Sequence, residues 1–311
     1  MAERKYFKRK CEYWLITSLT ATARVFPRRA GHWLFSALGG LAGRIFKRDR
    51  RRAVANLEIA FPDSPPMVRD AMAAAMFKTL GRNAFDFLNL KNASPEKLAS
   101  FVDGVQGMEC FEKAAALGRG VIVITGHIGC WELMPAYFVS LGHSVTVVAR
   151  KMKVDKLNEE LVGIRRSFGV TTVDRDSSPR EMIRPLKRGE ILGVLIDQHT
   201  SVGGAYVPFF GKPAFTPTGV AKLACLLGSP IVPMADFLGR DGKHTIRVLP
   251  AIFPPDDVSN KEVVVERLTT ECSLAVEQLI RIDPKQWVWF HHRWREPEGN
   301  QGSHDRVAAN A

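Results

Sequence analysis

The chain of 311 residues has few cysteines and no Cys-x-x-Cys pair. Its five cysteines are an odd number and widely spaced, which argues against a disulfide scaffold or a zinc site and favours reduced thiols in the cytoplasm. The basic N-terminal region also lacks an apolar stretch long enough to span a bilayer. Its uncharged stretches, Tyr13–Ala23 and Gly31–Gly43, are shorter than the roughly 17–25 residues that a spanning helix needs. We expect both to form helices that lie on or dip into a membrane.

Several catalytic motifs are missing as well. The chain has no Gly-x-Ser-x-Gly nucleophile elbow, no Gly-x-Gly-x-x-Gly or Walker-type phosphate loop, and no His-Glu-x-x-His zinc helix. No second histidine lies near His127 in sequence, and the adjacent His291 and His292 point in different directions. The sequence therefore predicts neither a metal nor a cofactor.

The charge is concentrated at one end of the chain. Residues 1–52 hold fourteen Lys and Arg against three acids, a net charge of +11, while the whole chain carries +12. A basic segment confined to one end and interleaved with apolar stretches is typical of a protein that binds an anionic membrane surface rather than nucleic acid. Arg4 to Lys10, followed by an apolar run and Ala21–Ala23, loosely imitates a signal peptide. Polar residues interrupt that run, so we expect the segment to be retained.

The pattern of apolar residues divides the chain into three parts. Residues 1–92 are expected to be helical, basic and membrane-associating, and residues 296–311 to form a disordered polar tail. Residues 93–295 alternate β-branched runs with helical stretches, which predicts an α/β domain whose mostly parallel sheet is covered on both faces. The strands are expected at 121–125, 144–149, 170–173, 191–196, 230–235 and 244–250, with a long loop over 201–219 and a closing helix over 256–282.

His127 and Glu132 follow the first of these strands. Ligands of open α/β sheets bind beyond the carboxyl ends of the strands, so this position favours function. If His127 lies in the turn and Glu132 in the first helical turn, Glu132 could orient the imidazole, giving a general base that deprotonates a hydroxyl. The same spacing also fits a structural histidine and a glutamate at a helix terminus.

Polar side chains follow two further strands. Arg150 comes after 144–149, and the next helix carries Arg165; their guanidinium groups could hold a phosphate or polarise a carbonyl. Asp197 and Gln198 come directly after 191–196. An acid in that position favours a functional role, with an Asx turn as the alternative. We expect Arg150, Arg165, Asp197 and Gln198 to contact substrate.

Several stretches, in this order and spacing, resemble the late acyltransferases of lipid A biosynthesis, within the wider His-x4-Asp/Glu glycerolipid acyltransferase superfamily. They are RRAVANLEIAFPD at 51–63, ITGHIGCWEL at 124–133, VAR at 148–150, IRRSFG at 164–169, LIDQ at 195–198, VPFFGKPAFTPTG at 207–219, GSPIVPM at 228–234 and PKQWVWFHHRWR at 284–295.

This resemblance implies a glycerolipid-acyltransferase-like αβ sandwich preceded by membrane-associated helices. It implies transfer of a fatty acyl chain from acyl carrier protein, or acyl-CoA, to a hydroxyl of a lipid A precursor at the cytoplasmic face of the inner membrane. His127 matches the catalytic base and Glu132 its acidic partner, while Arg150 and Arg165 match positions that are often basic. The sequence leaves open another acceptor, such as a lysophospholipid or an ornithine-type lipid, and a non-catalytic lipid-binding protein.

Overall fold

The computed structural model describes residues 18, 20–23, 25–90, 93–152, 154–200, 202–256 and 259–295. The predicted tail at 296–311, and most of the predicted helix over 13–23, lie outside these residues. The elements are α2 (Arg28–Ile45), α3 (Lys47–Ala60), α4 (Pro66–Leu90), α5 (Pro95–Phe101), β1 (Val102–Gln106), α6 (Met108–Ala115), β2 (Val121–Thr125), α7 (Leu133–Ser140), β3 (Val145–Ala149), α8 (Asp155–Ser167), β4 (Thr171–Asp174), α9 (Pro179–Lys187), β5 (Ile191–Leu195), β6 (Gly204–Phe209), β7 (Lys212–Pro217), α10 (Gly219–Leu227), β8 (Ile231–Leu238), β9 (His244–Val248), α11 (Lys261–Ile282) and the short 3-10 helix η1 (Pro284–Gln286).

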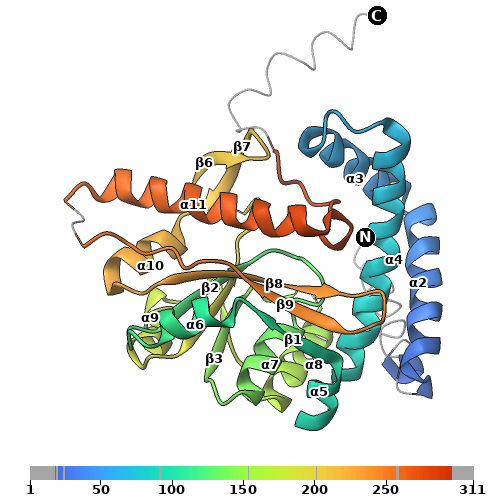
Figure 1. Ribbon diagram of the computed structural model, residues 1–311, viewed down its shortest axis with the longest axis horizontal. Helices are drawn as coiled ribbons and strands as arrows, with labels where there is room; N and C mark the ends of the chain where they lie inside the picture. Colours follow the sequence, from blue (N-terminus) through green and yellow to red (C-terminus); the bar gives the residue numbers. More distant parts are fainter. Residues whose placement is uncertain are drawn as a thin grey trace, which may run out of the picture.

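A seven-stranded sheet forms the centre of the α/β part, in the order β1-β9-β8-β2-β5-β3-β4 (Figure 1). Neighbouring strands run parallel except β8 and β9, which pair antiparallel. The predicted mostly parallel α/β sheet is confirmed. The six strands expected from β-branched runs all form, with ends shifted by a few residues at most.

The two faces of the sheet bury different side chains of the same strand, because successive residues of a strand point to opposite faces. Ile122 and Ile124 of β2 pack with α3, α4 and α11, whereas Val121 and Val123 pack with α6 and α7. β2 is buried along its whole length, which explains its unbroken run of apolar residues. The first residue after it is thereby held at a fixed place.

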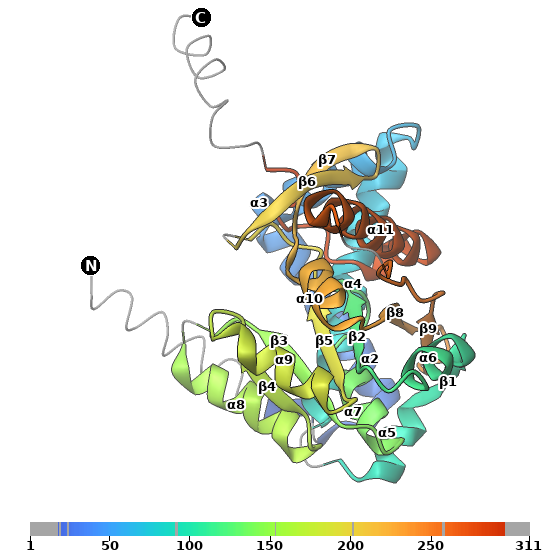
Figure 2. The same ribbon diagram turned by 90° about the vertical axis from the view of Figure 1, so that its left-hand side faces the viewer.

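Three segments differ from the sequence-based expectation, the first being β1 (Val102–Gln106), where no strand was predicted. The predicted loop over 201–219 contains an antiparallel hairpin, β6 and β7, which packs against α11 (Figure 2). The glycines and prolines of this segment weigh against strands in a sequence-based prediction, so the hairpin was not expected. A two-residue turn at Phe210 and Gly211 joins the two strands. The closing helix begins at Lys261 rather than at Asp256. The Asn260 side chain caps its start by accepting a hydrogen bond from the Val263 backbone N–H.

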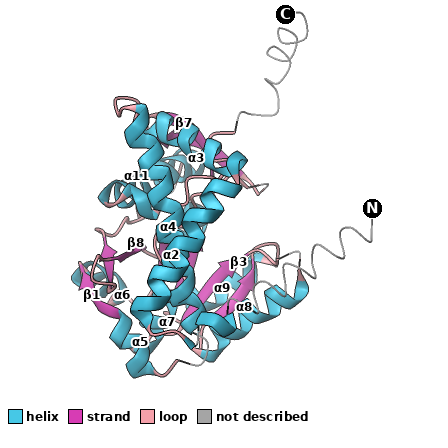
Figure 3. Cartoon of the chain, turned by 90° about the vertical axis from the view of Figure 1, so that its right-hand side faces the viewer, coloured by secondary structure: helices cyan, strands magenta, loops and turns pink. Residues whose placement is uncertain are grey.

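The N-terminal helices lie along one side of the sheet domain. α2 runs beside α4 over most of its length, and α3 packs against α4 at the end of the molecule where α11 lies (Figure 3). Among the described residues, no helix is both long enough and apolar enough to cross a membrane. The α2 helix contains the predicted stretch Gly31–Gly43.

Candidate active site

His127 lies in the turn that follows β2, and Asp197 lies just beyond the end of β5. These two strands are parallel neighbours, with Thr125 opposite Leu195 in register. His127 lies two residues after Thr125, and Asp197 lies two residues after Leu195. The sheet thus brings together two side chains that are 70 positions apart in sequence. Both residues were predicted from their places at strand ends, and the structure places them in contact.

Asp197 holds both the ring and the backbone of His127. Its Oδ1 lies 2.8 Å from His127 Nδ1, and its Oδ2 accepts the His127 backbone N–H at 2.7 Å. The indole N–H of Trp287 donates to the same Oδ2 at 2.7 Å. Asp197 is 1% exposed, and its oxygens face these protein donors. The predicted contact of Asp197 with substrate stays a prediction.

The protonation of this pair follows from its partners. Burial would raise the pKa of the Asp197 carboxyl, but the charge and hydrogen bonds of His127, with a further contribution from His291, hold that pKa well below its ordinary value. An ionised carboxylate only accepts hydrogen bonds, so the proton of neutral His127 resides on Nδ1. The Nε2 atom is left with the lone pair that a general base requires.

Gln198 lies beside the imidazole of His127, with its amide nitrogen 3.2 Å from Nδ1 and almost as far from Nε2. Its amide nitrogen is 3.1 Å from His127 Nε2 and 2.9 Å from His291 Nε2. The rings of His127 and His291 have centroids 5.0 Å apart. Burial, and then the nearby His127, lower the pKa of His291 to about 4, so this second imidazole is neutral at pH 7 and can accept from Gln198.

Glu132 contacts Arg165 instead of His127. Arg165 donates from Nε to Glu132 Oε2 at 2.8 Å and from Nη2 to Oε1 at 2.5 Å, a bidentate pair whose side chains are 10% and 12% exposed. Glu132 immediately precedes α7, as expected for a residue at the helix start. In the structure the carboxylate in contact with the His127 ring is that of Asp197, and the predicted role of Glu132 as the acidic partner of His127 stays a prediction.

Arg150 is exposed at the end of β3 and forms no hydrogen bond or ion pair with another described residue. The structure brings His127, Asp197 and Gln198 into one cluster and joins Glu132 to Arg165, but it adds no partner for Arg150. His291 and Trp287 were not predicted as site residues. Their only signal was their place in the PKQWVWFHHRWR stretch, which runs past the site: Val288 N–H donates to the His127 carbonyl at 3.1 Å.

A cavity of about 440 Å³ opens beside this cluster, lined mainly by apolar side chains. Leu80 and Phe87 of α4 form one wall, and Leu157 and Ile164 of α8 form another. Trp131 lines the cavity and also meets the His127 ring, with centroids 4.9 Å apart. One side chain thus separates an apolar space from the imidazole. Among the described residues, no three His, Cys, Asp or Glu side chains are grouped so that they could hold a metal ion.

A buried carboxylate, an imidazole with a free Nε2 lone pair and an adjoining apolar cavity at the end of a parallel sheet define a site for acid-base chemistry on an apolar substrate. The chain belongs to the bacterial lipid A biosynthesis acyltransferase family, whose model matches residues 2–296. The protein is accordingly an acyltransferase, as the sequence predicted.

Named relatives agree with this family. The chain is 25% identical to a lipid A biosynthesis myristoyltransferase of Escherichia coli (strain K12) over 89% of this chain and 84% of that protein. It is 25% identical to a lipid A biosynthesis lauroyltransferase of the same strain, over 92% of this chain and 90% of that protein. A phosphatidylinositol mannoside acyltransferase of Mycobacterium tuberculosis (strain CDC 1551 / Oshkosh) is also 25% identical, over 74% of this chain and 72% of that protein.

Proposed function

We propose that the enzyme transfers a fatty acyl chain from a thioester, with acyl carrier protein as the preferred donor and acyl-CoA as the alternative, to a hydroxyl of a membrane glycolipid. The preferred acceptor is a precursor of lipid A, because relatives that act in lipid A biosynthesis align with almost the whole chain. The observation that carries the proposal is the contact between Asp197 and His127 Nδ1, which leaves Nε2 as a base.

In the proposed reaction His127 Nε2 takes the proton of the acceptor hydroxyl as its oxygen attacks the thioester carbonyl. The bond from oxygen to carbon forms, the tetrahedral intermediate collapses, and the bond from carbon to sulfur breaks. The imidazolium then returns its proton to the departing thiolate, so the base is regenerated and the products are an ester and a thiol. Asp197 stabilises the imidazolium between these two proton transfers, because it stays ionised.

Gln198 and His291 lie beside the ring of His127. The Gln198 amide nitrogen lies 3.2 Å from His127 Nδ1 and 3.1 Å from Nε2, so an acceptor hydroxyl that reaches Nε2 would approach next to this amide. We infer that the hydroxyl displaces this contact while Gln198 keeps its bond to His291. A neutral His291 adds no positive charge next to the imidazolium that forms on His127.

The apolar cavity beside Trp131 fits an acyl chain of one of the two lipids. Burial of each methylene is favourable by about 0.8 kcal/mol, so such a cavity holds a chain against water. Glu132 forms part of the cavity wall, and together with Arg165 it also borders a narrower apolar space under α7. Arg150, exposed at the end of β3, remains proposed as a contact for an anionic headgroup.

The surface formed by α2 and the start of α3 supports a site of action at the cytoplasmic face of the inner membrane. Trp33 is 75% exposed, Ile45 63% and Phe46 57%, and the neighbouring Arg44 and Lys47 are basic. Apolar side chains flanked by basic ones are typical of a face that rests on an anionic leaflet. This face would bring the catalytic domain to a lipid acceptor.

The test is acyl transfer by the purified full chain, from radiolabelled acyl carrier protein or acyl-CoA to a lipid A precursor, a lysophospholipid or an ornithine lipid. We expect transfer to the lipid A precursor, and a loss of about 10²–10⁴-fold in His127→Ala. The control is His143→Gln, a half-buried histidine at the opposite end of the sheet, before β3. Transfer to another lipid would change the acceptor, and full activity of His127→Ala would overturn the proposed base.

A further inference from the structure

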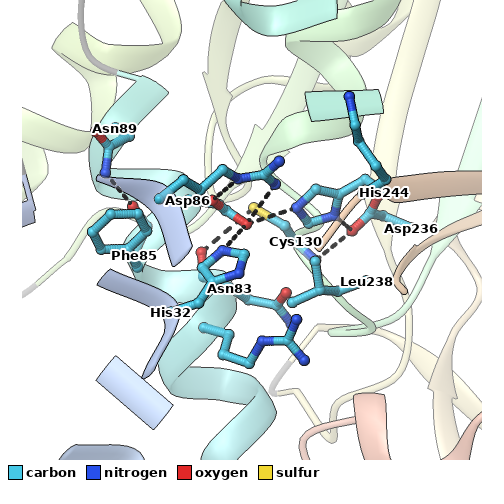
Figure 4. Close-up of polar contacts among 12 residues, drawn as sticks. His32, Asn83, Phe85, Asp86, Asn89, Cys130, Asp236, Leu238 and His244 are labelled. Atoms are coloured by element: carbon cyan, nitrogen blue, oxygen red, sulfur yellow. Dashed lines mark hydrogen bonds and ion pairs between the residues drawn. The ribbon is translucent and has the colours of Figure 1, made fainter. Parts of the chain in front are cut away.

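A second group of buried charges lies outside the catalytic cluster. His244 of β9 stands between two carboxylates: its Nδ1 lies 2.7 Å from Asp236 Oδ2 on β8, and its Nε2 lies 2.9 Å from Asp86 Oδ2 on α4 (Figure 4). All three residues are fully buried. We call Asp86, His244 and Asp236 the positioning chain.

The positioning chain is ionic at neutral pH. Each ring nitrogen of His244 faces a carboxylate, so both must carry protons and the ring is a cation. Burial would lower the pKa of His244, but Asp236 and Asp86 outweigh it and raise that pKa to about 9. Burial would likewise raise the pKa of Asp86, but the bonds from His244, His32 and Arg28 hold it well below its ordinary value.

One end of the positioning chain reaches the loop that carries His127. Asp236 Oδ2 accepts the backbone N–H of Cys130 at 2.8 Å, three residues beyond His127. Gly129, at φ +59°, lies so close that a Cβ there would meet Asp236 O at 2.1 Å and Asp236 Oδ2 at 2.8 Å. The other carboxylate oxygen, Oδ1, is buried without a hydrogen bond from a described residue. His244 and the Cys130 N–H are therefore the partners that hold this carboxylate.

The other end of the positioning chain reaches α2. Arg28 donates from Nε and Nη2 to the two oxygens of Asp86 at 2.9 and 3.0 Å. His32 Nε2 lies 2.7 Å from Asp86 Oδ2. Charged and titratable groups therefore face His244 from α4 and β8 directly, and from α2 through Asp86. The helix that presents the exposed Trp33 is thus joined by polar contacts to the backbone of the catalytic loop.

We propose that Asp236, held by the His244 cation and through it by Asp86, is a positioning residue for the loop 126–132. The positioning chain thereby couples the packing of α2 against α4 to the position of His127. This proposal rests on the proposed acyl transfer at His127. The physical reason is that a buried ionic chain resists displacement at either end, because breaking it leaves a charge without a partner in a water-free interior. Displacement of catalytic groups by about 1 Å can cost 10²-fold in rate.

The experiment compares Asp236→Asn and His244→Gln with Val248→Ala in the full chain. Val248 is buried in the same strand as His244 but packs in the apolar cluster under the sheet. We measure kcat, KM, the free energy of unfolding in urea, and amide hydrogen exchange of residues 127–132. If Asp236 and His244 only stabilise the fold, their variants should lose unfolding free energy as Val248→Ala does and should keep their kcat.

We expect both polar variants to lose about 10- to 100-fold in kcat with little change in KM, and to speed exchange over 127–132. Val248→Ala should lose stability and keep its kcat. Equal kcat in the three variants at matched stability would overturn the proposal. Because His127→Ala is measured alongside, a fully active His127→Ala points to failure of the proposed function, whereas an inactive one with an unaffected Asp236→Asn points to failure of the positioning role.

Arg28→Lys tests the α2 end and keeps the proposal falsifiable if Asp236→Asn does not fold. Lysine retains the charge but cannot form the bidentate pair, and Arg28 is partly exposed, so the variant should fold. We expect faster exchange over 127–132 and a lower kcat than in Arg29→Lys, an exposed neighbour. Unchanged exchange and kcat in Arg28→Lys would show that α2 is not coupled to the loop.

Discussion

The Asp197 carboxylate binds His127 at two points, the ring Nδ1 at 2.8 Å and the backbone N–H at 2.7 Å. A single buried side chain thereby sets the tautomer of the imidazole and the position of the turn that carries it. The indole of Trp287 holds the carboxylate from the opposite direction. Changes at this carboxylate should therefore affect the chemical step more than substrate binding.

Asp197→Asn should lower kcat by about 10²-fold or more, because an amide can present its N–H to Nδ1 and place the proton of His127 on the wrong nitrogen. KM should change little. The control is Asp174→Asn, which also alters an aspartate at the end of a parallel strand, β4, but away from His127. Steady-state kinetics of the two variants decide the matter: equal activity would remove Asp197 from the mechanism.

Gly126→Ala should impair the site by crowding. A Cβ at Gly126 would lie 3.1 Å from Asp197 Oδ2 and 3.2 Å from its Cγ, so the carboxylate must shift. Such overpacking costs about 1–3 kcal/mol of unfolding free energy, and kcat should fall with it. Gly163→Ala in α8 meets no atom within 4 Å and should stabilise by about 0.5–1 kcal/mol instead. An active and stable Gly126→Ala enzyme would show that Asp197 tolerates displacement.

Glu132 and Arg165 should behave as one unit. Glu132→Gln and Arg165→Lys each leave part of a nearly buried ion pair unmatched, at a cost of about 1–3 kcal/mol in unfolding free energy. The double variant should cost less than the sum, as a double-mutant cycle would measure. Arg166→Lys, one residue on and exposed, is the control. Loss of activity in Glu132→Gln alone, without loss of stability, would return Glu132 to a direct role at His127.

His291 should make the protein less stable in acid. Its folded pKa of about 4 is below the unfolded value near 6.5, so the unfolded state binds more protons between these pH values and stability falls as the pH decreases. The loss amounts to at most about 3 kcal/mol by pH 4. Urea unfolding from pH 7 to 4 should show a shallower decline in His291→Gln than in the unaltered protein. Parallel declines would contradict a neutral, buried His291.

Membrane binding should have two separable parts. Trp33→Ser with Phe46→Ser should weaken binding to anionic vesicles even at high salt, because apolar insertion is not screened. Arg44→Gln with Lys47→Gln should weaken binding at low salt only. The control is Leu226→Ser, an exposed apolar residue of α10, the helix that lies at the left of Figure 1, opposite α2. Vesicle sedimentation that responds equally to all three changes would rule out α2 as the contact face.

The sequence determined the elements and the residues at their ends. The β-branched run at Val121–Thr125 removes all its apolar side chains from water as a strand that is buried on both faces, and His127 then lies just beyond the end of that strand. The same reasoning placed Asp197 and Gln198 beyond β5 and Glu132 at the start of α7. The hairpin within 201–219 was missed, because its glycines and prolines weigh against strands until α11 is present to cover them.

The tertiary structure alone decided the partners. Sequence spacing favoured Glu132, five residues from His127, whereas the order β2-β5-β3 brings Asp197 beside it from 70 residues away and leaves Glu132 to Arg165. Strand order depends on how helices cover the two faces of the sheet, which no local pattern encodes. The same holds for Asp86, His244 and Asp236, each ordinary in its own segment: they become a chain of buried charges only where α4, β9 and β8 meet.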